Sequence, residues 1–103
     1  MALVDENCKS DVTALSESEI EKLTPKVPDW TRKGKTIERE FEFEDFDGAM
    51  DFVDDVADLA AEQDHHPDIL ISYNEVRLTL STHKVGGLSR NDFVMAAKID
   101  ELV

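Results

Sequence analysis

A chain of 103 residues is long enough for one modest hydrophobic core and too short for two, so a single domain is expected. Acidic side chains outnumber basic ones by 24 to 11, which gives a formal net charge of −13. This balance argues against direct binding of nucleic acid or of anionic membrane surfaces, because both are bound through clusters of Lys and Arg. We interpret the acidity as a source of solubility or an adaptation to high salt.

The first 15 residues show no convincing period, and we expect them to form a flexible lead-in to a single domain over residues 16–103. They lack the basic start and apolar core of a signal peptide, and no later run is long enough to cross a bilayer. The single cysteine, Cys8, excludes an internal disulfide and favours a reducing compartment. A cytoplasmic protein is therefore expected.

The domain begins with a helix signal. Ser16 and Glu19 have the spacing of a capping box, which predicts a short helix through Leu23 that ends at Pro25 and Pro28. A short strand over residues 30–32 and a turn over residues 33–35 follow.

The next strand is predicted over residues 36–43 by a nearly pure period of two. One face carries Ile37, Arg39, Phe41 and Phe43, and the other carries Glu38, Glu40 and Glu42. One side of the sheet should therefore be buried and the other exposed to solvent.

A long amphipathic helix is predicted after the Asp45 cap. Apolar residues recur at helical spacing, with most of the aspartates outside their face. The apolar face comprises Phe46, Ala49, Phe52, Val53, Val56, Leu59 and Ala60. The pattern stops before Pro67, whose ring disfavours helix at the preceding residue.

Two more strands, over residues 68–73 and 76–81, are predicted to join through a tight turn at residues 73–75. A second box-like start at residues 89–92 precedes a helix over residues 93–102. The order helix-strand-strand-helix-strand-strand-helix predicts an α+β domain, with a four-stranded antiparallel sheet and helices packed on one face.

All three histidines, His65, His66 and His83, and the only tyrosine lie between Asp64 and His83. Histidine changes its charge near neutral pH, so three of them in one segment favour acid–base chemistry. They occupy the ends of predicted elements, where a small sheet protein can present side chains without disturbing its core. Histidines in surface loops without a function are the alternative interpretation.

Three other chemistries fit the pattern less well. A zinc site needs converging ligands, but adjacent residues in extended chain point to opposite sides, and no cysteine pair or HExxH motif is present. Nucleophilic catalysis by Ser72 or Ser81 lacks a GxSxG motif, and Cys8 is remote in sequence. The Gly86-Gly87 pair is too short for a phosphate-binding loop. No metal site is therefore expected.

A motif spread over several predicted elements indicates a family, which the spacing of the histidines alone does not. It consists of Asp64-His65-His66-Pro67-Asp68, Tyr73-Asn74-Glu75-Val76, Leu78-Thr79-Leu80-Ser81-Thr82-His83, Gly87-Leu88-Ser89 and Asp92, with Trp30, Phe41-Glu42-Phe43 and Asp45-Phe46 upstream. With these residues the chain resembles the pterin-4a-carbinolamine dehydratases, also called 4a-hydroxytetrahydrobiopterin dehydratases. The similarity covers roughly the last three quarters of the chain.

The resemblance implies the residues of a site. The matching catalytic positions are His65, His66 and His83, and the matching positions around the substrate are Asp64, Asp92 and Pro67. For Asp92, a favourable charge at a helix N-terminus is the alternative role, and for Pro67 a structural one. Members of the family often carry a charged residue four positions before the first histidine, whereas this chain has Ala61 there and Glu62 next to it.

The resemblance also implies an activity without a cofactor. A pterin 4a-carbinolamine would lose its hydroxyl group as water and a ring proton to give quinonoid dihydropterin, as in tetrahydrobiopterin recycling. We expect His65 and His83 to be the main acid–base pair and His66 to position the pterin. A homodimer or homotetramer is implied as well. The alternative is a non-catalytic protein-binding or assembly module, because animal members of the family also bind a homeodomain transcription factor.

Overall fold

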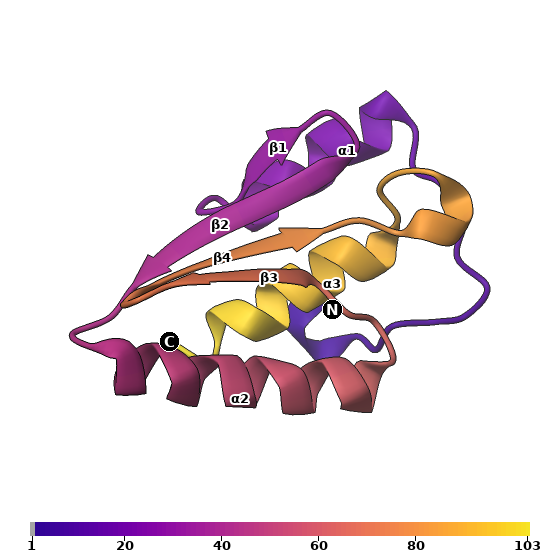
Figure 1. Ribbon diagram of the computed structural model, residues 1–103. Helices are drawn as coiled ribbons and strands as arrows, with labels where there is room; N and C mark the ends of the chain where they lie inside the picture. The colour runs from indigo at the N-terminus through magenta and orange to yellow at the C-terminus, as the bar shows by residue number, and fades with distance from the viewer. Residues whose placement is uncertain (1) are drawn as a thin grey trace.

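Four antiparallel strands form one sheet in the spatial order β1-β2-β4-β3, and helices α2 and α3 cover one of its faces (Figure 1). The computed structural model describes residues 2–103. The strands are β1 (Thr31–Lys33), β2 (Thr36–Glu42), β3 (Asp68–Ser72) and β4 (Glu75–Leu80). The α-helices are α1 (Glu17–Leu23), α2 (Phe46–Gln63) and α3 (Arg90–Asp100), and short 3-10 helices are η1 (Leu3–Asp5), η2 (Thr24–Lys26) and η3 (His83–Val85). The predicted α+β architecture and element order are confirmed.

The two central strands carry the inner face of the sheet. Ile37 pairs with Leu80 and Phe41 with Val76 in the β2–β4 register, and all four side chains are buried. The glutamates between them on β2 face the open side, as the period of two predicts. Among the described residues, strand β3 pairs with β4 alone and forms one edge of the sheet.

Helix α2 begins and ends at identifiable signals. The Asp45 side chain accepts a hydrogen bond from the Gly48 N–H (2.8 Å), which satisfies one of the free amides of the first turn. The helix ends at Asp64, whose left-handed backbone (φ 51°) reverses the chain. Phe46 was expected on the apolar face but is 46% exposed, because it lies in the first turn and stacks on Tyr73 instead. The rest of that face packs on the sheet.

Helix α3 starts three residues earlier than predicted. Its N-cap is Ser89, so the polar first turn from Arg90 to Asp92 belongs to the helix, although only the residues after it show an apolar pattern. Residues 93–96 are completely or almost completely buried against the sheet. This burial fixes the first turn of α3, including Asp92, under the end of β4.

The lead-in makes more contacts than the sequence predicts. Leu3 is buried, the Lys98 ammonium donates to the Val4 carbonyl (2.8 Å), and the Leu15 N–H donates to the Leu88 carbonyl (2.9 Å). These contacts join backbone atoms of residues 2–15 to distant parts of the chain. Such contacts produce no periodic pattern in the sequence. For this reason they could not be predicted, and the segment was expected to be a loose lead-in.

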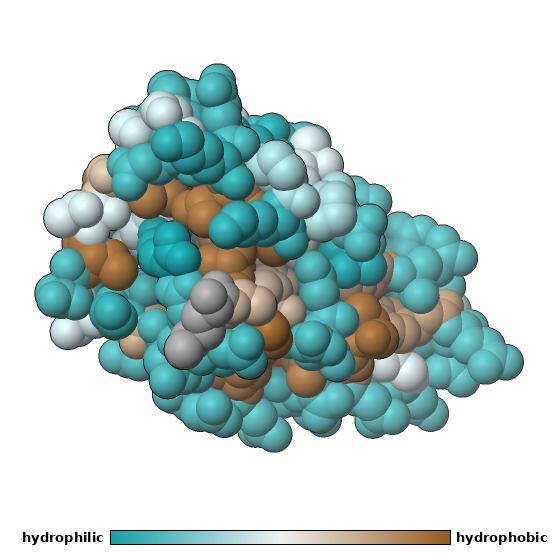
Figure 2. Space-filling view, turned by 180° about the vertical axis from the view of Figure 1, so that it is seen from behind, coloured by the Kyte–Doolittle hydropathy of each residue, from teal (hydrophilic) through white to brown (hydrophobic). Residues whose placement is uncertain are grey.

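The surface agrees with the composition. Hydrophilic side chains cover most of the face seen from behind, with apolar groups visible only between them (Figure 2). Within residues 2–103, none of the helices combines the length and the apolar character needed to span a membrane.

Candidate active site

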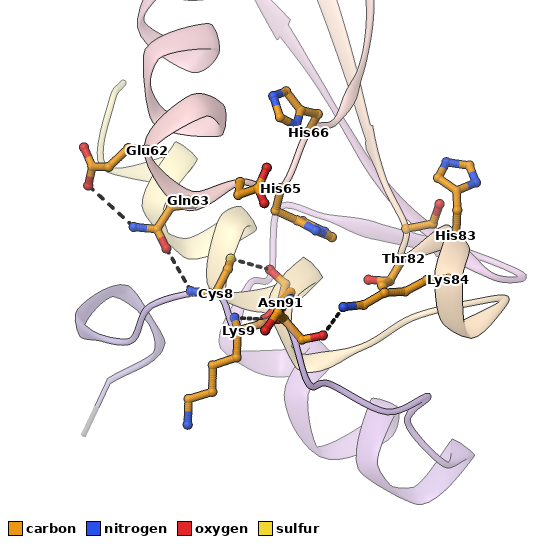
Figure 3. Close-up of a pocket in the computed structure, with 13 residues that line it drawn as sticks. Cys8, Lys9, Glu62, Gln63, His65, His66, Thr82, His83, Lys84 and Asn91 are labelled. Atoms are coloured by element: carbon orange, nitrogen blue, oxygen red, sulfur yellow. Dashed lines mark hydrogen bonds between the residues drawn. The ribbon is translucent and has the colours of Figure 1, made fainter.

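One cavity of about 650 Å³ lies where the end of α2, the η3 turn and the N-terminal segment meet. All three histidines line it, together with Asp64. The sequence placed these residues at the ends of different elements, and the fold brings those ends together (Figure 3). The predicted convergence of the three imidazole rings on one cavity therefore exists in this structure.

His65 is the most enclosed of the three rings. It follows the left-handed residue that ends α2, and its side chain is 11% exposed. Its Nε2 lies 2.7 Å from Oδ1 of Asp92, in the first turn of α3. One ring nitrogen is therefore held by a carboxylate while the other is left for the cavity.

Asp92 is completely buried behind His65 and is saturated with hydrogen bonds. Its Oδ2 accepts from the Thr82 hydroxyl (2.8 Å) and from the Ser89 N–H (2.9 Å). The Thr82 oxygen also lies 2.7 Å from the Ser89 hydroxyl, which donates to it, because the Thr82 proton is directed at Asp92. An ionised carboxylate can only accept hydrogen bonds, so with Asp92 in that form Nε2–H of His65 donates to Oδ1 and Nδ1 keeps a free lone pair when the ring is neutral.

His66 and His83 are exposed and approach the cavity from different sides. His66 continues the chain beyond His65, and His83 is the first residue of η3, directly after Thr82. In Figure 3 the rings of His66 and His83 lie apart from each other, and the ring of His65 lies below both, nearer Asn91. Exposed rings next to an anchored one can exchange protons with a bound ligand and with solvent.

Two predicted residues do not line the cavity. Asp92 was expected next to the substrate, but it is buried behind His65 and contacts the cavity only through that ring. Pro67 is half-buried at the start of the path into β3 and is not part of the cavity wall. Of the two residues discussed upstream of the histidines, Glu62 lines the cavity and Ala61 does not.

Sequence reasoning missed one wall of the cavity altogether. Cys8, Lys9 and Ser10, from the segment expected to be a flexible lead-in, line it together with the histidines. Burial, assisted by the negative charge of Asp92, raises the pKa of the Cys8 thiol to about 11. No local signal marks these residues, because side chains from distant segments, the ends of α2 and α3 and the η3 turn, hold them.

Within residues 2–103, no three His, Cys, Asp or Glu side chains come together in a way that could hold a metal ion. The arrangement can instead transfer protons: a carboxylate-bound imidazole faces a hollow of suitable size for a bicyclic ring, with two further imidazoles at its rim.

Comparison with known proteins identifies the family. Residues 13–102 match the family described as pterin 4 alpha carbinolamine dehydratase. A relative from Nitrosospira multiformis, named "Putative pterin-4-alpha-carbinolamine dehydratase", is 44% identical over 95 residues, which cover 92% of this chain and 84% of the relative. A protein of the same name from Chloroflexus aurantiacus is 48% identical over 89 residues, which cover 86% of this chain and 96% of the relative.

Solved structures agree with the sequence comparison. A crystal structure of a "transcriptional coactivator/pterin dehydratase" from Brucella melitensis superposes with a TM-score of 0.83 at 34% identity, over 87% of this chain and 98% of that one. A "pterin dehydratase-like protein", described as a RuBisCO assembly factor in the alpha-carboxysome, gives a TM-score of 0.59 at 26% identity, over 71% of this chain and 84% of that one. The match over nearly the whole domain, together with these relatives, shows that the chain belongs to the pterin-4a-carbinolamine dehydratase family.

Proposed function

We propose that this protein dehydrates 4a-hydroxytetrahydropterin to quinonoid dihydropterin by general acid–base catalysis, as a step of tetrahydrobiopterin recycling. The observation that carries the proposal is the convergence of three imidazole rings on one cavity, one of them anchored on a buried carboxylate. The reaction needs one proton delivered to the leaving hydroxyl group and one removed from the ring. Imidazole can do both near neutral pH.

The reaction needs one histidine as an acid and another as a base. The ring nitrogen next to C4a supplies the electron pair that expels the hydroxyl group, which leaves as water after it takes a proton from an imidazolium. Loss of the proton on that nitrogen then completes the quinonoid product, and an imidazole accepts it. The two transfers together leave the pair of histidines with the same number of protons as before.

His65 is best suited to accept the ring proton. Its Nε2–H is directed at Asp92, so Nδ1 presents a lone pair to the cavity, and the imidazolium formed on protonation is stabilised by the buried carboxylate. His83, exposed on η3, is suited to deliver the proton to the hydroxyl group and to be recharged from solvent. His66 positions the pterin at the rim, next to Asp64.

A structure of the protein with a bound pterin tests the location of the site. Crystals soaked with 7,8-dihydrobiopterin, which cannot undergo the reaction, should show the bicyclic ring among His65, His66 and His83. A pterin bound elsewhere, with the histidine cavity empty, would refute the proposal.

A non-catalytic role as a binding or assembly module is the second candidate. The RuBisCO assembly factor among the similar structures supports it, because that protein is described as pterin dehydratase-like. Turnover discriminates the two roles: a pure assembly module binds its partner without dehydrating the carbinolamine, and the loss of its histidines leaves that binding unchanged.

We also propose that the chain forms a homodimer or homotetramer and uses the β3 edge to do so. On this strand Ile69 and Leu70 are 39% and 55% exposed and point to opposite faces of the sheet, and Tyr73 and Phe46 extend the apolar surface at its end. Edge strands in monomers are more often covered or charged, because their unpaired backbone groups can pair with another chain. Pairing of two β3 strands would cover these side chains.

A further inference from the structure

Residues 7–10, here called the N-terminal strap, contribute Cys8, Lys9 and Ser10 to the wall of the cavity and are held from three directions. Gln63 donates through Nε2 to Oδ1 of Asn7 (3.2 Å) and accepts from the Cys8 N–H through Oε1 (2.8 Å). Asn91 accepts from the Lys9 N–H (2.9 Å) and donates to the Lys9 carbonyl (2.7 Å).

The third attachment comes from the η3 turn. The Lys84 ammonium donates to the carbonyl of Ser10. Consecutive strap residues are thus bound by side chains from α2, α3 and η3, the segments that surround the cavity (Figure 3).

Each of the three holding side chains lies within two positions of a site residue in the sequence. Gln63 precedes His65 by two positions, Asn91 comes directly before Asp92, and Lys84 comes directly after His83. A shift of the strap would therefore be transmitted to both proposed acid–base residues and to the carboxylate behind one of them.

The holding amides are committed to the strap. Gln63 and Asn91 are 8% and 5% exposed, and the strap supplies most of the hydrogen bonds that their side chains make. A buried amide without a hydrogen-bond partner is unfavourable. If the strap moved away, the side chains of these two residues would lose most of their partners, so their burial favours the strap in its present place. The family match begins at residue 13, so the strap precedes the part of the chain that defines the family.

We propose that the N-terminal strap is a working part of the pterin site. It holds the ends of α2, η3 and α3 in one arrangement and forms the wall against which the substrate is placed. This inference rests on the proposed function, because it assigns the strap to the same cavity. Gln63, Asn91 and Lys84 act as positioning residues through the strap.

Variants that release the strap test the proposal. Asn91→Ala removes both bonds to Lys9, and Lys84→Met removes the bond to Ser10 from an exposed side chain whose loss cannot unfold the core. Each should raise the Kd for 7,8-dihydrobiopterin about tenfold, because a displaced wall no longer meets the ligand. Their effects should be less than additive in the double variant, because both release the same strap.

Matched controls weaken the same N-terminal segment outside the cavity. Glu6→Gln breaks the pair with Arg90, and Lys98→Met breaks the bond to the Val4 carbonyl. Both should lower the Tm without changing the Kd for the pterin. Equal weakening by controls and strap variants, fully additive effects of Asn91→Ala and Lys84→Met, or an unchanged Kd in both would overturn the proposal.

Histidine NMR separates this proposal from the proposed function. In the protein without ligand, the ring resonances of His65 and His83 should shift in Asn91→Ala and Lys84→Met and stay in place in Glu6→Gln. If the wild-type chain binds no pterin but these shifts occur, the proposed function fails and the positioning by the strap stands. If the wild type binds pterin and the shifts are absent, the strap proposal fails alone.

Discussion

Nε2 of His65 and Oδ1 of Asp92 lie 2.7 Å apart, and the carboxylate has no exposed surface. The two residues come from the end of α2 and the start of α3, which are 27 positions apart in the chain. Asp92 accepts two further hydrogen bonds, from Thr82 and from the backbone of Ser89, so it cannot rotate to follow the ring. The carboxylate therefore fixes both the orientation of His65 and the nitrogen that faces the cavity.

Asp92→Asn should lower kcat for carbinolamine dehydration by about 10-fold to 100-fold, less than the roughly 10²–10⁴-fold usual for a general base, because His65 itself remains. The amide can still accept one hydrogen bond from the Ser89 N–H, but it no longer stabilises an imidazolium on His65. Steady-state kinetics check this, with the exposed Asp58→Asn on α2 as a control for loss of one negative charge. A kcat equal to that of the control would show that Asp92 only caps α3.

Cys8 should react slowly with iodoacetamide at pH 8. Burial raises the pKa of its thiol from 9.0 to about 11, which lowers the thiolate fraction at this pH by about 100-fold. The alkylation rate, followed by mass spectrometry, should rise steeply above pH 9 and should increase when the chain is unfolded in urea. Alkylation of the folded protein at pH 8 as fast as that of glutathione would contradict the burial of this thiol.

The pair of Glu6 and Arg90 should make stability depend on pH in the acid range. Hydrogen bonds from Arg90 lower the pKa of Glu6 below its ordinary value of 4.5. Because the folded-state pKa is the lower one, the stabilisation is fully present above pH 4.5 and is lost as the pH falls through the folded-state value. The stabilisation is lost because the carboxyl group of Glu6 becomes protonated and no longer forms an ion pair with Arg90.

Glu6→Gln measures this contribution. At pH 7 it should lower the free energy of unfolding by about 0.5 kcal/mol, as for other partly exposed ion pairs. Urea titrations should show the difference between variant and wild type shrinking as the pH is lowered from 5 towards 3. A difference that grows in that direction would show that the sign of the linkage is wrong.

Leu70→Lys should dissociate the proposed homo-oligomer. A charge on the exposed face of the β3 edge opposes pairing with a second copy while leaving the monomer folded, because the side chain is 55% exposed. Light scattering after size-exclusion chromatography gives the mass, and Thr31→Lys on the opposite edge strand β1 is the control. An unchanged oligomer in Leu70→Lys, or dissociation by Thr31→Lys, would move the interface away from β3.

The sequence predicted the elements because their signals are local. The alternation from Ile37 to Phe43, the cap at Asp45 and the stop before Pro67 are all read within a few residues, and the structure confirms them to within a few positions. The histidines could be identified because their signal is local too: they belong to a sequence motif that lies at the ends of these elements. Phe46 was misplaced because helical spacing does not reveal that a first-turn residue lies beyond the sheet.

The remaining parts of the site depend on distant contacts. Asp92 was identified, but its burial behind His65 follows from the packing of α3 under β4, which no local pattern encodes. The N-terminal strap was missed because side chains more than 50 positions away hold it. Its residues carry no periodicity, so composition alone described them as a lead-in.

The rate of dehydration of 4a-hydroxytetrahydropterin, measured for the wild-type chain and for His65→Ala, His66→Ala and His83→Ala, tests the central claim most directly. The account predicts turnover by the wild type, losses of about 10²-fold or more in kcat for His65→Ala and His83→Ala, and mainly a raised KM for His66→Ala. Wild-type turnover that all three substitutions leave unchanged would contradict it.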